Sequence, residues 1–217
     1  MASTVTENVS FYLGKIVSEQ PNIILQGDLV MPPRQKGSCD SPRETGNPAT
    51  FFTCFSFTIH ALNVNKTADG LAFFLAPIED HPKSGGGYLG IFDEDVRSPQ
   101  NVVAVEFDTY INKDDYIADP DSLHIGLDVM SIKSKKTVRW EFENDLCSTG
   151  VDLTDALPEW VRVGFSAFAG HSETHDVNSW YFSSSFGDDA ETLAEPLKTI
   201  NPRLAAFLHL HFGSASN

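Results

Sequence analysis

The chain has 217 residues, a net charge of -15 at pH 7 and 41% apolar residues. A protein this acidic is repelled by phosphate backbones and anionic membranes, so nucleic-acid binding is excluded as a main function. The apolar content excludes a disordered chain, and the lack of an 18-residue apolar run excludes a membrane-spanning segment. The excess of acidic residues suits a protein that binds divalent cations.

Short β-rich segments, separated by clusters of Gly, Pro, Asn and Asp, follow one another through most of the chain and predict strands. They are Val9–Val17, Asn22–Leu25, Phe51–Leu62, Leu71–Ile78, Val102–Tyr110, His124–Ile132, Trp160–Phe168 and Val177–Phe186. Regularly spaced strands without intervening helices indicate an antiparallel β-sandwich or barrel. Residues 32–48 are rich in Pro, Gly, Ser and charge and are expected to form a loop.

The C-terminal part of the chain has a different pattern. Residues 1–186 are predicted to form one β domain, and residues 187–217 a C-terminal tail outside it. Within this tail, the run from Arg203 to Phe212 is expected to form a short helix.

The segment Val103–Asn112 carries the clearest chemical signal. Alternate residues of a strand share a face, so Glu106, Asp108 and Tyr110 are predicted to point together, with Asn112 at the strand end. The two carboxylates would lie about 6.5–7 Å apart along the strand. Burying such a pair without a counter-charge is costly, and a divalent cation would supply one.

Two further metal-ligand types follow in the sequence. Asp119 and His124 precede the next predicted strand, and they would complete a cation site if that strand pairs with the first. Carboxylates with an imidazole favour a transition metal such as manganese, whereas carboxylate, amide and carbonyl oxygens favour calcium. A solvated acidic strand end is an equally good interpretation of the spacing.

Two other motifs give little evidence of function. Gly85–Gly90 matches a dinucleotide-binding glycine pattern, but no strand leads into it and no helix follows. Ser172, His175 and Asp176 are the residue types of a catalytic triad, but neighbouring residues on a strand face opposite ways.

Seven segments form an ordered set of motifs. They are Gln20–Asp28, Ala68–Pro77, Gly85–Gly90, Val103–Tyr110, His124–Val129 with Ser131–Thr137, Leu157–Ala167 and Thr174–Trp180. The set strongly resembles the legume (L-type) lectin family, in a member shortened by about two strands after Val30 and again after Trp140. The resemblance implies an all-β fold, a two-sheet antiparallel jelly-roll sandwich of the concanavalin type.

The resemblance also implies a metal and sugar site. Manganese, or another transition metal, would be held by Glu106, Asp108, Asp119 and His124. Calcium would be held by Asp108, the Tyr110 carbonyl, Asn112 and Asp119. The sugar would be bound by Asp69, Gly87, Tyr110 and Asn112, with His171 and Ser172 in the variable loop. The family has a cis peptide bond before the sugar-binding aspartate, here Ala68–Asp69.

We therefore expect a non-catalytic, calcium- and manganese-dependent lectin that binds the carbohydrate of glycoconjugates. The short loop from Gly170 to Thr174 favours a hexose such as mannose or glucose. The alternative is a lectin-like seed defence or storage protein that has lost sugar binding. A glycoside hydrolase is disfavoured, because Tyr110 stands where a related hydrolase pattern has its second catalytic acid. In the long loop after Asn112, Asp114 or Asp115 could compete as a metal ligand.

Location and assembly rest on the resemblance alone. It implies the secretory pathway, with a vacuolar or extracellular destination, and homo-oligomers formed through sheet edges. The first ten residues contain no apolar stretch that would serve as a secretory signal, and a chain without one would be cytoplasmic. Asn8 and Asn65 lie in sequons for N-glycosylation, which apply to a secreted glycoprotein.

Overall fold

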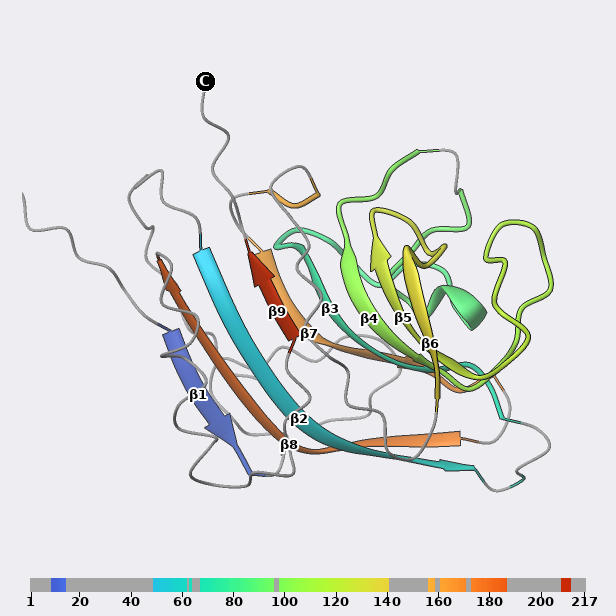
Figure 1. Cartoon of the computed structure of the whole chain (residues 1–217), viewed down its shortest axis with the longest axis horizontal. Helices are drawn as coiled ribbons and strands as arrows, with labels where there is room; N and C mark the ends of the chain where they lie inside the picture. Colours follow the sequence, from blue (N-terminus) through green and yellow to red (C-terminus); the bar gives the residue numbers. More distant parts are fainter. Residues whose placement is uncertain are drawn as a thin grey trace, which may run out of the picture. The chain divides into compact units, whose positions relative to one another are not determined.

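The computed structural model describes residues 9–14, 49–61, 63, 67–95, 98–140, 156–158, 161–170, 173–186 and 208–211. Its elements are β1 (Val9–Leu13), β2 (Ala49–Ala61), β3 (Gly70–Pro77), the 3-10 turn η1 (Gly86–Tyr88), β4 (Val103–Asp108), β5 (His124–Val129), β6 (Lys136–Arg139), β7 (Val161–Phe168), β8 (Glu173–Phe186) and β9 (Leu208–His211). The predicted all-β class is confirmed (Figure 1).

The strands form two sheets. The four-stranded sheet has the order β1-β8-β2-β9, and the five-stranded sheet has the order β6-β5-β4-β3-β7. Neighbouring strands run antiparallel, as in β3 with β4 and β4 with β5. The described residues contain no helix with the length and hydrophobicity that a membrane span needs.

The chain divides into two compact units. One comprises residues 1–57, 145–154 and 177–217, and the other comprises residues 58–144 and 155–176. In the first unit, aromatic rings pack along β1, β2 and β8. Phe182 stacks on Phe11 and on Phe51 with ring centroids 5.6 Å apart in both pairs, and Trp180 meets Phe11 edge-on at 4.8 Å.

The second unit holds the five-stranded sheet, and β4 and β5 are buried along their whole length. Small strand residues on one face of this sheet, Ala72, Ala76 and Ala104, leave room for loop residues. Leu89 and Phe92 pack there with them in one hydrophobic cluster. The loops that carry these residues therefore cover the face from which Glu106 and Asp108 project.

Most of the predicted strands that fall on described residues are present, and three differences stand out. The strand β6 is not predicted, because its sequence is Lys-Thr-Val-Arg and three of its four residues are exposed. The strand β8 begins at Glu173, four residues before the predicted start at Val177. The predicted strand Asn22–Leu25, the expected loop 32–48, and the gap expected after Val30 lie outside the described residues.

The third difference is the expected helix between Arg203 and Phe212, which is wrong. Leu208–His211 form β9, which pairs with β2 so that Phe51 lies opposite Leu210. A short segment has a weak helical preference, because the first turn fixes several dihedral angles for one hydrogen bond. Pairing along the edge of β2 satisfies the backbone groups instead.

Candidate functional site

Three predicted metal ligands meet at the end of the five-stranded sheet. Asp108 on β4 lies opposite His124 on β5, and Glu106 lies opposite Gly126. The Nε2 atom of His124 is 3.1 Å from Glu106 Oε1, and its Nδ1 atom is 4.0 Å from Asp108 Oδ2. All three side chains are buried, and their ligand atoms lie within 4.8 Å of one another. The pairing of β4 with β5 thus unites residues that the sequence places on different strands.

Burial makes the negative charges of this cluster costly. It raises the pKa of Asp108 to about 8, against a lowering by the hydrogen bond from the Tyr110 amide and with further raising by Asp119 and Glu106. Burial likewise raises the pKa of Asp119. Burial thus disfavours the ionised forms of Asp108 and Asp119, and a bound divalent ion would reverse this effect.

The polar atoms that lack partners fit a cation. Among the described residues, the buried atoms Nδ1 of His124 and Oδ1 of Asn112 have no hydrogen-bond partner. The amide of Asn112 donates to Asp119 Oδ2 at 2.6 Å, which holds the loop from Asn112 to Asp119 closed at its ends. Carboxylate, amide oxygen and imidazole are ligands that calcium and transition ions take.

Asp114 and Asp115 in this loop are both exposed. Asp114 Oδ1 accepts the amides of Tyr116 and Ile117 at 3.0 and 2.9 Å, so its carboxylate caps the local turn. This bonding uses Asp114 Oδ1 within the loop, and competition by Asp114 or Asp115 for a metal stays a prediction.

Asp128 and Ser134 belong to the cluster, and the sequence analysis missed them. Ser134 Oγ lies 2.8 Å from Glu106 Oε1 and 2.6 Å from Asp128 Oδ1. A hydroxyl carries one proton, so the two contacts together need a proton on one carboxyl. Burial, followed by the charge of Glu106, raises the pKa of Asp128 well above its usual range and favours the proton there. The period-2 spacing of His124, Gly126 and Asp128 was the available signal.

Gly126 leaves space for the Glu106 carboxylate. A Cβ atom at this position would lie 2.1 Å from Ser134 Oγ and 2.2 Å from Glu106 Oε1. We expect Gly126→Ala to push Glu106 out of the cluster, destabilise the fold by about 1–3 kcal/mol and weaken metal binding about 10- to 100-fold. Elemental analysis and thermal unfolding with and without added metal measure both effects.

Gly164→Ala is the matched control, because a Cβ atom there would make ordinary contacts with the Phe74 ring at 3.5 Å. Unchanged metal content in Gly126→Ala would show that Glu106 is not a ligand.

The proposed sugar residues lie beside this cluster. The Ala68–Asp69 peptide bond is cis, in agreement with the resemblance. Asp69 is bound through its backbone on both sides, since its amide donates to the Phe168 carbonyl at 2.8 Å and its carbonyl accepts the Thr109 amide at 3.2 Å. Gly70, the next residue, pairs with Asp108. Asp69 therefore directly precedes the strand partner of the predicted metal ligand Asp108.

Gly87 and Asn112 are in contact. A Cβ atom at Gly87 would lie 2.7 Å from both side-chain end atoms of Asn112, so only glycine brings the backbone this close. Tyr110 is 43% exposed, which leaves its ring accessible to a ligand. His171 and Ser172 lie outside the described residues.

A buried polar link joins this region to β8. Thr109 Oγ1 donates to Glu173 Oε2 at 2.9 Å, and His175 Nε2 lies 3.2 Å from the same carboxylate oxygen. The Thr109 carbonyl also accepts the hydroxyl of Thr67 at 2.7 Å. These contacts position the backbone between Asp108 and Tyr110. Sequence analysis missed Glu173, whose partner is distant along the chain.

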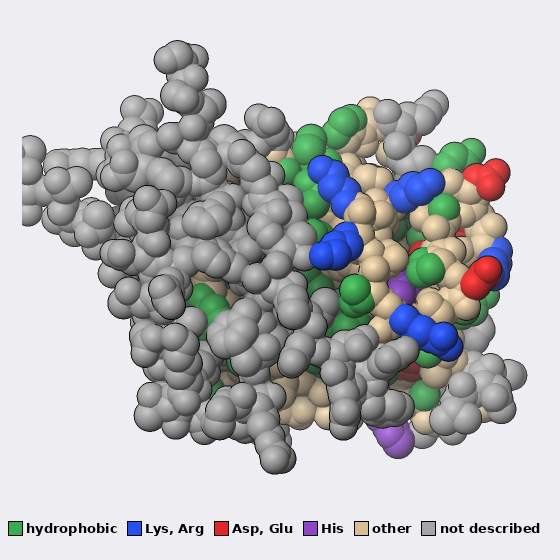
Figure 2. Space-filling view, viewed as in Figure 1, with side chains coloured by type: hydrophobic (Ala, Val, Ile, Leu, Met, Phe, Trp, Pro, Cys, Tyr) green, Lys and Arg blue, Asp and Glu red, His purple; other side chains and the backbone are tan. Residues whose placement is uncertain are grey.

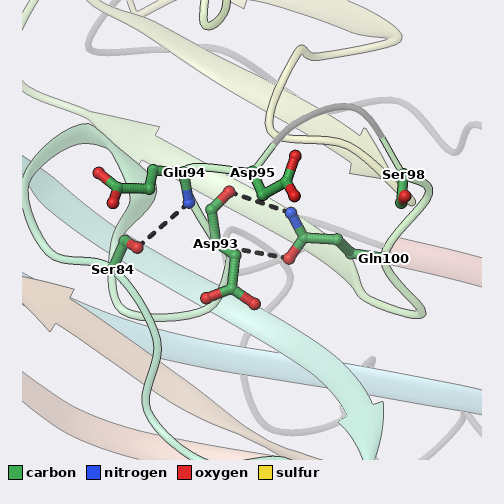
Figure 3. Close-up of a pocket in the computed structure, with 6 residues that line it drawn as sticks. All are labelled: Ser84, Asp93, Glu94, Asp95, Ser98 and Gln100. Carbon is green, nitrogen blue, oxygen red and sulfur yellow. Dashed lines mark hydrogen bonds between the residues drawn. The ribbon is translucent and has the colours of Figure 1, made fainter.

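An open depression of about 440 Å³ lies elsewhere on the second unit (Figure 3). Its lining residues are Ser84, Asp93, Glu94, Asp95, Ser98 and Gln100. The Gln100 side chain bonds both backbone groups of Asp93, and Ser84 Oγ accepts the Glu94 amide. These bonds hold the surface loop that lines the depression. The polar side chains there therefore have a structural role.

Figure 2 shows one face of the molecule, on which the described lysine and arginine side chains stand in separate places rather than in one patch. The described part of this face therefore shows no continuous basic surface for a polyanion.

The chain is thus an all-β protein with a candidate cation site in a buried carboxylate–histidine cluster. Beside this cluster lie an aspartate after a cis bond, a close-packed glycine loop and an exposed tyrosine. Comparison with known proteins gives its family. A profile described as the legume lectin domain matches residues 39–145 and 141–198. The chain belongs to the legume lectin family.

Individual relatives agree with this assignment. The chain is 37% identical to a lectin from Glycine max, over 82% of this chain and 81% of that protein. Lectin II from Ulex europaeus has a similar structure, with a TM-score of 0.66 and 37% identity over 81% of this chain and 98% of that one. Arcelin-5, a lectin-like defence protein from Phaseolus vulgaris, has a TM-score of 0.65 and 28% identity over 83% and 99%.

The family gives the fold class and the broad function. The chain has the jelly-roll fold of the concanavalin type predicted from the sequence. Legume lectins bind carbohydrates without catalysing a reaction, so the chain is a member of a non-enzymatic, carbohydrate-binding family. Metal binding is typical of that family, and the cluster of Glu106, Asp108 and His124 is a candidate site for it.

Proposed function

We propose that the protein is a lectin that binds a hexose only when its metal site is loaded. The observation that carries the proposal is the shared position of Asp108. Its carboxylate lies in the buried cluster with Glu106 and His124, and its strand partner Gly70 directly follows Asp69. A cation at Asp108 would order the backbone that presents Asp69 and Tyr110.

The donor set divides between two ions. Glu106, Asp108, Asp119 and His124 would hold manganese or another transition ion, because an imidazole joins the carboxylates. Asp108, the Tyr110 carbonyl, Asn112 and Asp119 would hold calcium, which takes oxygen ligands. The Oδ1 atom of Asn112 lacks a hydrogen-bond partner and supports this assignment. The Asn112 NH₂ group then remains for the sugar.

The sugar would be held by three kinds of group. Asp69 accepts hydroxyl protons, the Gly87 amide and the Asn112 side chain donate, and the ring of Tyr110 packs on the apolar C–H face. For the hexose itself, the short loop after Gly170 favours mannose or glucose. Lectin II from Ulex europaeus has been solved with galactose, so both hexose types belong in the test.

Metal removal tests the proposal. On columns of immobilised mannose and of immobilised galactose, we expect retention on one column and elution by a chelator. Dialysis with calcium and manganese together should restore retention, because the ligands must be reassembled before the sugar residues are ordered. Retention that a chelator does not change would contradict the metal dependence, and a glycan array with and without chelator would give the specificity.

The likeness to arcelin-5 favours a second candidate, a lectin-like defence or storage protein without sugar binding. The two candidates differ in one measurement. Metal-loaded protein that passes through both columns and binds nothing on the array supports the second candidate and overturns the first.

A further inference from the structure

Phe168 is an exposed aromatic residue at the end of β7, next to the backbone of Asp69. Its carbonyl accepts the Asp69 amide at 2.8 Å, and Gly170 donates to the Ala68 carbonyl at 3.0 Å. The strands β3 and β7 run side by side (Figure 1). Phe168 pairs with Gly70 in this register. The position of Phe168 beside the proposed sugar-binding aspartate is therefore set by main-chain hydrogen bonds.

The Phe168 side chain points to the loop-covered face of the sheet. Ser166, two residues earlier in β7, donates from Oγ to the Leu89 carbonyl at 2.5 Å. Because alternate strand residues share a face, Phe168 faces the same loop as Ser166. Gly70 pairs with both Phe168 and Asp108. Two inter-strand spacings of about 4.8 Å therefore separate the backbones of Phe168 and Asp108.

The ring packs against the loop that carries Gly87. A Cβ atom at Gly85 would lie 2.4–3.1 Å from three atoms of the Phe168 ring, so the ring rests on the glycine backbone. Gly87, two residues further, touches the Asn112 side chain. One short loop thus connects Phe168 at one end with the proposed calcium and sugar residue Asn112 at the other.

We propose that Phe168 is a specificity-determining residue, which contacts an apolar substituent on the sugar that Asp69 and Asn112 bind. The inference rests on the proposed function. A ring that only supported the loop would be stabilised most by full burial, yet Phe168 keeps 38% of its surface exposed beside the site. An aromatic face accessible at that position favours an aryl or alkyl group, because such groups stack on aromatic rings.

The test compares two ligands on the same metal-loaded protein. Methyl and phenyl glycosides of the hexose retained on the column are titrated by calorimetry against the unmodified chain and Phe168→Ala. We expect the unmodified chain to bind the phenyl glycoside about 3- to 10-fold more tightly than the methyl glycoside, from a stacking contribution of about 0.5–1.5 kcal/mol. In Phe168→Ala the ratio should fall to about one, with methyl glycoside affinity retained.

Two further variants separate recognition from support of the loop. Phe168→Leu keeps apolar volume against Gly85 and should bind the phenyl glycoside with an intermediate preference. Ile78→Ala removes another exposed apolar side chain, 56% accessible, beyond the far end of β3, and should leave the ratio unchanged.

Equal loss of both glycosides in Phe168→Ala, with a constant ratio, would assign Phe168 a structural role and overturn the inference while leaving the proposed function standing. An unmodified chain that binds the two glycosides equally would also overturn the inference alone. A metal-loaded chain that binds neither glycoside would overturn the proposed function, and the inference with it.

Discussion

Asp108→Asn is expected to remove metal binding and sugar binding together. The substitution preserves the size of the side chain but removes the charge that two proposed cation sites share. Altering groups that only support metal ligands costs about 10- to 100-fold in affinity, so loss of a shared ligand should cost more than 100-fold. The sugar affinity should fall with it, because Asp108 pairs with Gly70 beside Asp69. Elemental analysis and column retention measure the two losses.

Asp93→Asn is the control for this variant, since Asp93 is an exposed acid outside the cluster and its substitution lowers the net negative charge equally. It should keep both activities. Full calcium content in Asp108→Asn would show that the calcium ligands are other residues. Metal-free Asp108→Asn that still binds sugar would contradict the coupling of the two sites.

Asp69→Ala is expected to abolish sugar binding and to leave the metal content nearly intact. Each hydrogen bond to a charged group contributes about 1.5–3 kcal/mol, so a carboxylate that accepts two hydroxyls accounts for about 100-fold or more in affinity. The contacts of Asp69 with Phe168 and Thr109 use its backbone, so the variant retains them. Calorimetry with the retained hexose and elemental analysis measure the two properties.

Asp93→Asn serves as its control, because Asp93 is exposed and its hydrogen bonds with Gln100 also use the backbone. Asp69→Ala with unchanged affinity would remove Asp69 from the sugar site. If metal is lost along with sugar, the residue acts in folding of the cation site rather than in recognition. Loss of sugar binding alone in Asp69→Ala, and loss of both activities in Asp108→Asn, would show that sugar binding depends on metal binding and not the reverse.

The buried cluster gives a physical reason for the proposed dependence of sugar binding on a cation. Glu106, Asp108 and Asp119 bring carboxylates near one another, and burial with mutual repulsion raises the pKa of Asp108 to about 8. Metal binding favours the ionised forms and so competes with protons for the same atoms. In the proposed lectin, the organisation of the loop from Tyr110 to Asp119 would therefore depend on the ion.

Thr109 connects the region around the cluster to β8. Its side chain binds Glu173, its carbonyl accepts the Thr67 hydroxyl, and its amide binds the Asp69 carbonyl. Thr109 stands between Asp108 and Tyr110 in the chain, so three segments converge at one residue. Glu173 is the first residue of β8, so one buried carboxylate connects the start of β8 to the residue that follows Asp108.

The period of two in the sequence determined much of the fold and part of the site. Alternation along Val103–Asp108 predicts that Glu106 and Asp108 share one face, because side chains in a strand point alternately to opposite sides. The same rule, applied to His124, Gly126 and Asp128, would have found Asp128. Local pattern also separated strands from loops, as the agreement for β3, β4, β5 and β7 shows.

Only the tertiary structure decided which side chains and segments become neighbours. Strand register brings His124 opposite Asp108, and main-chain hydrogen bonds bring Phe168 beside Asp69. Pairing with β2 turned Leu208–His211 into a strand where a helix was expected. The physical reason is the same in each case. A pattern along the chain reports the direction of a side chain, whereas its neighbours depend on pairing and packing between segments that are far apart in sequence.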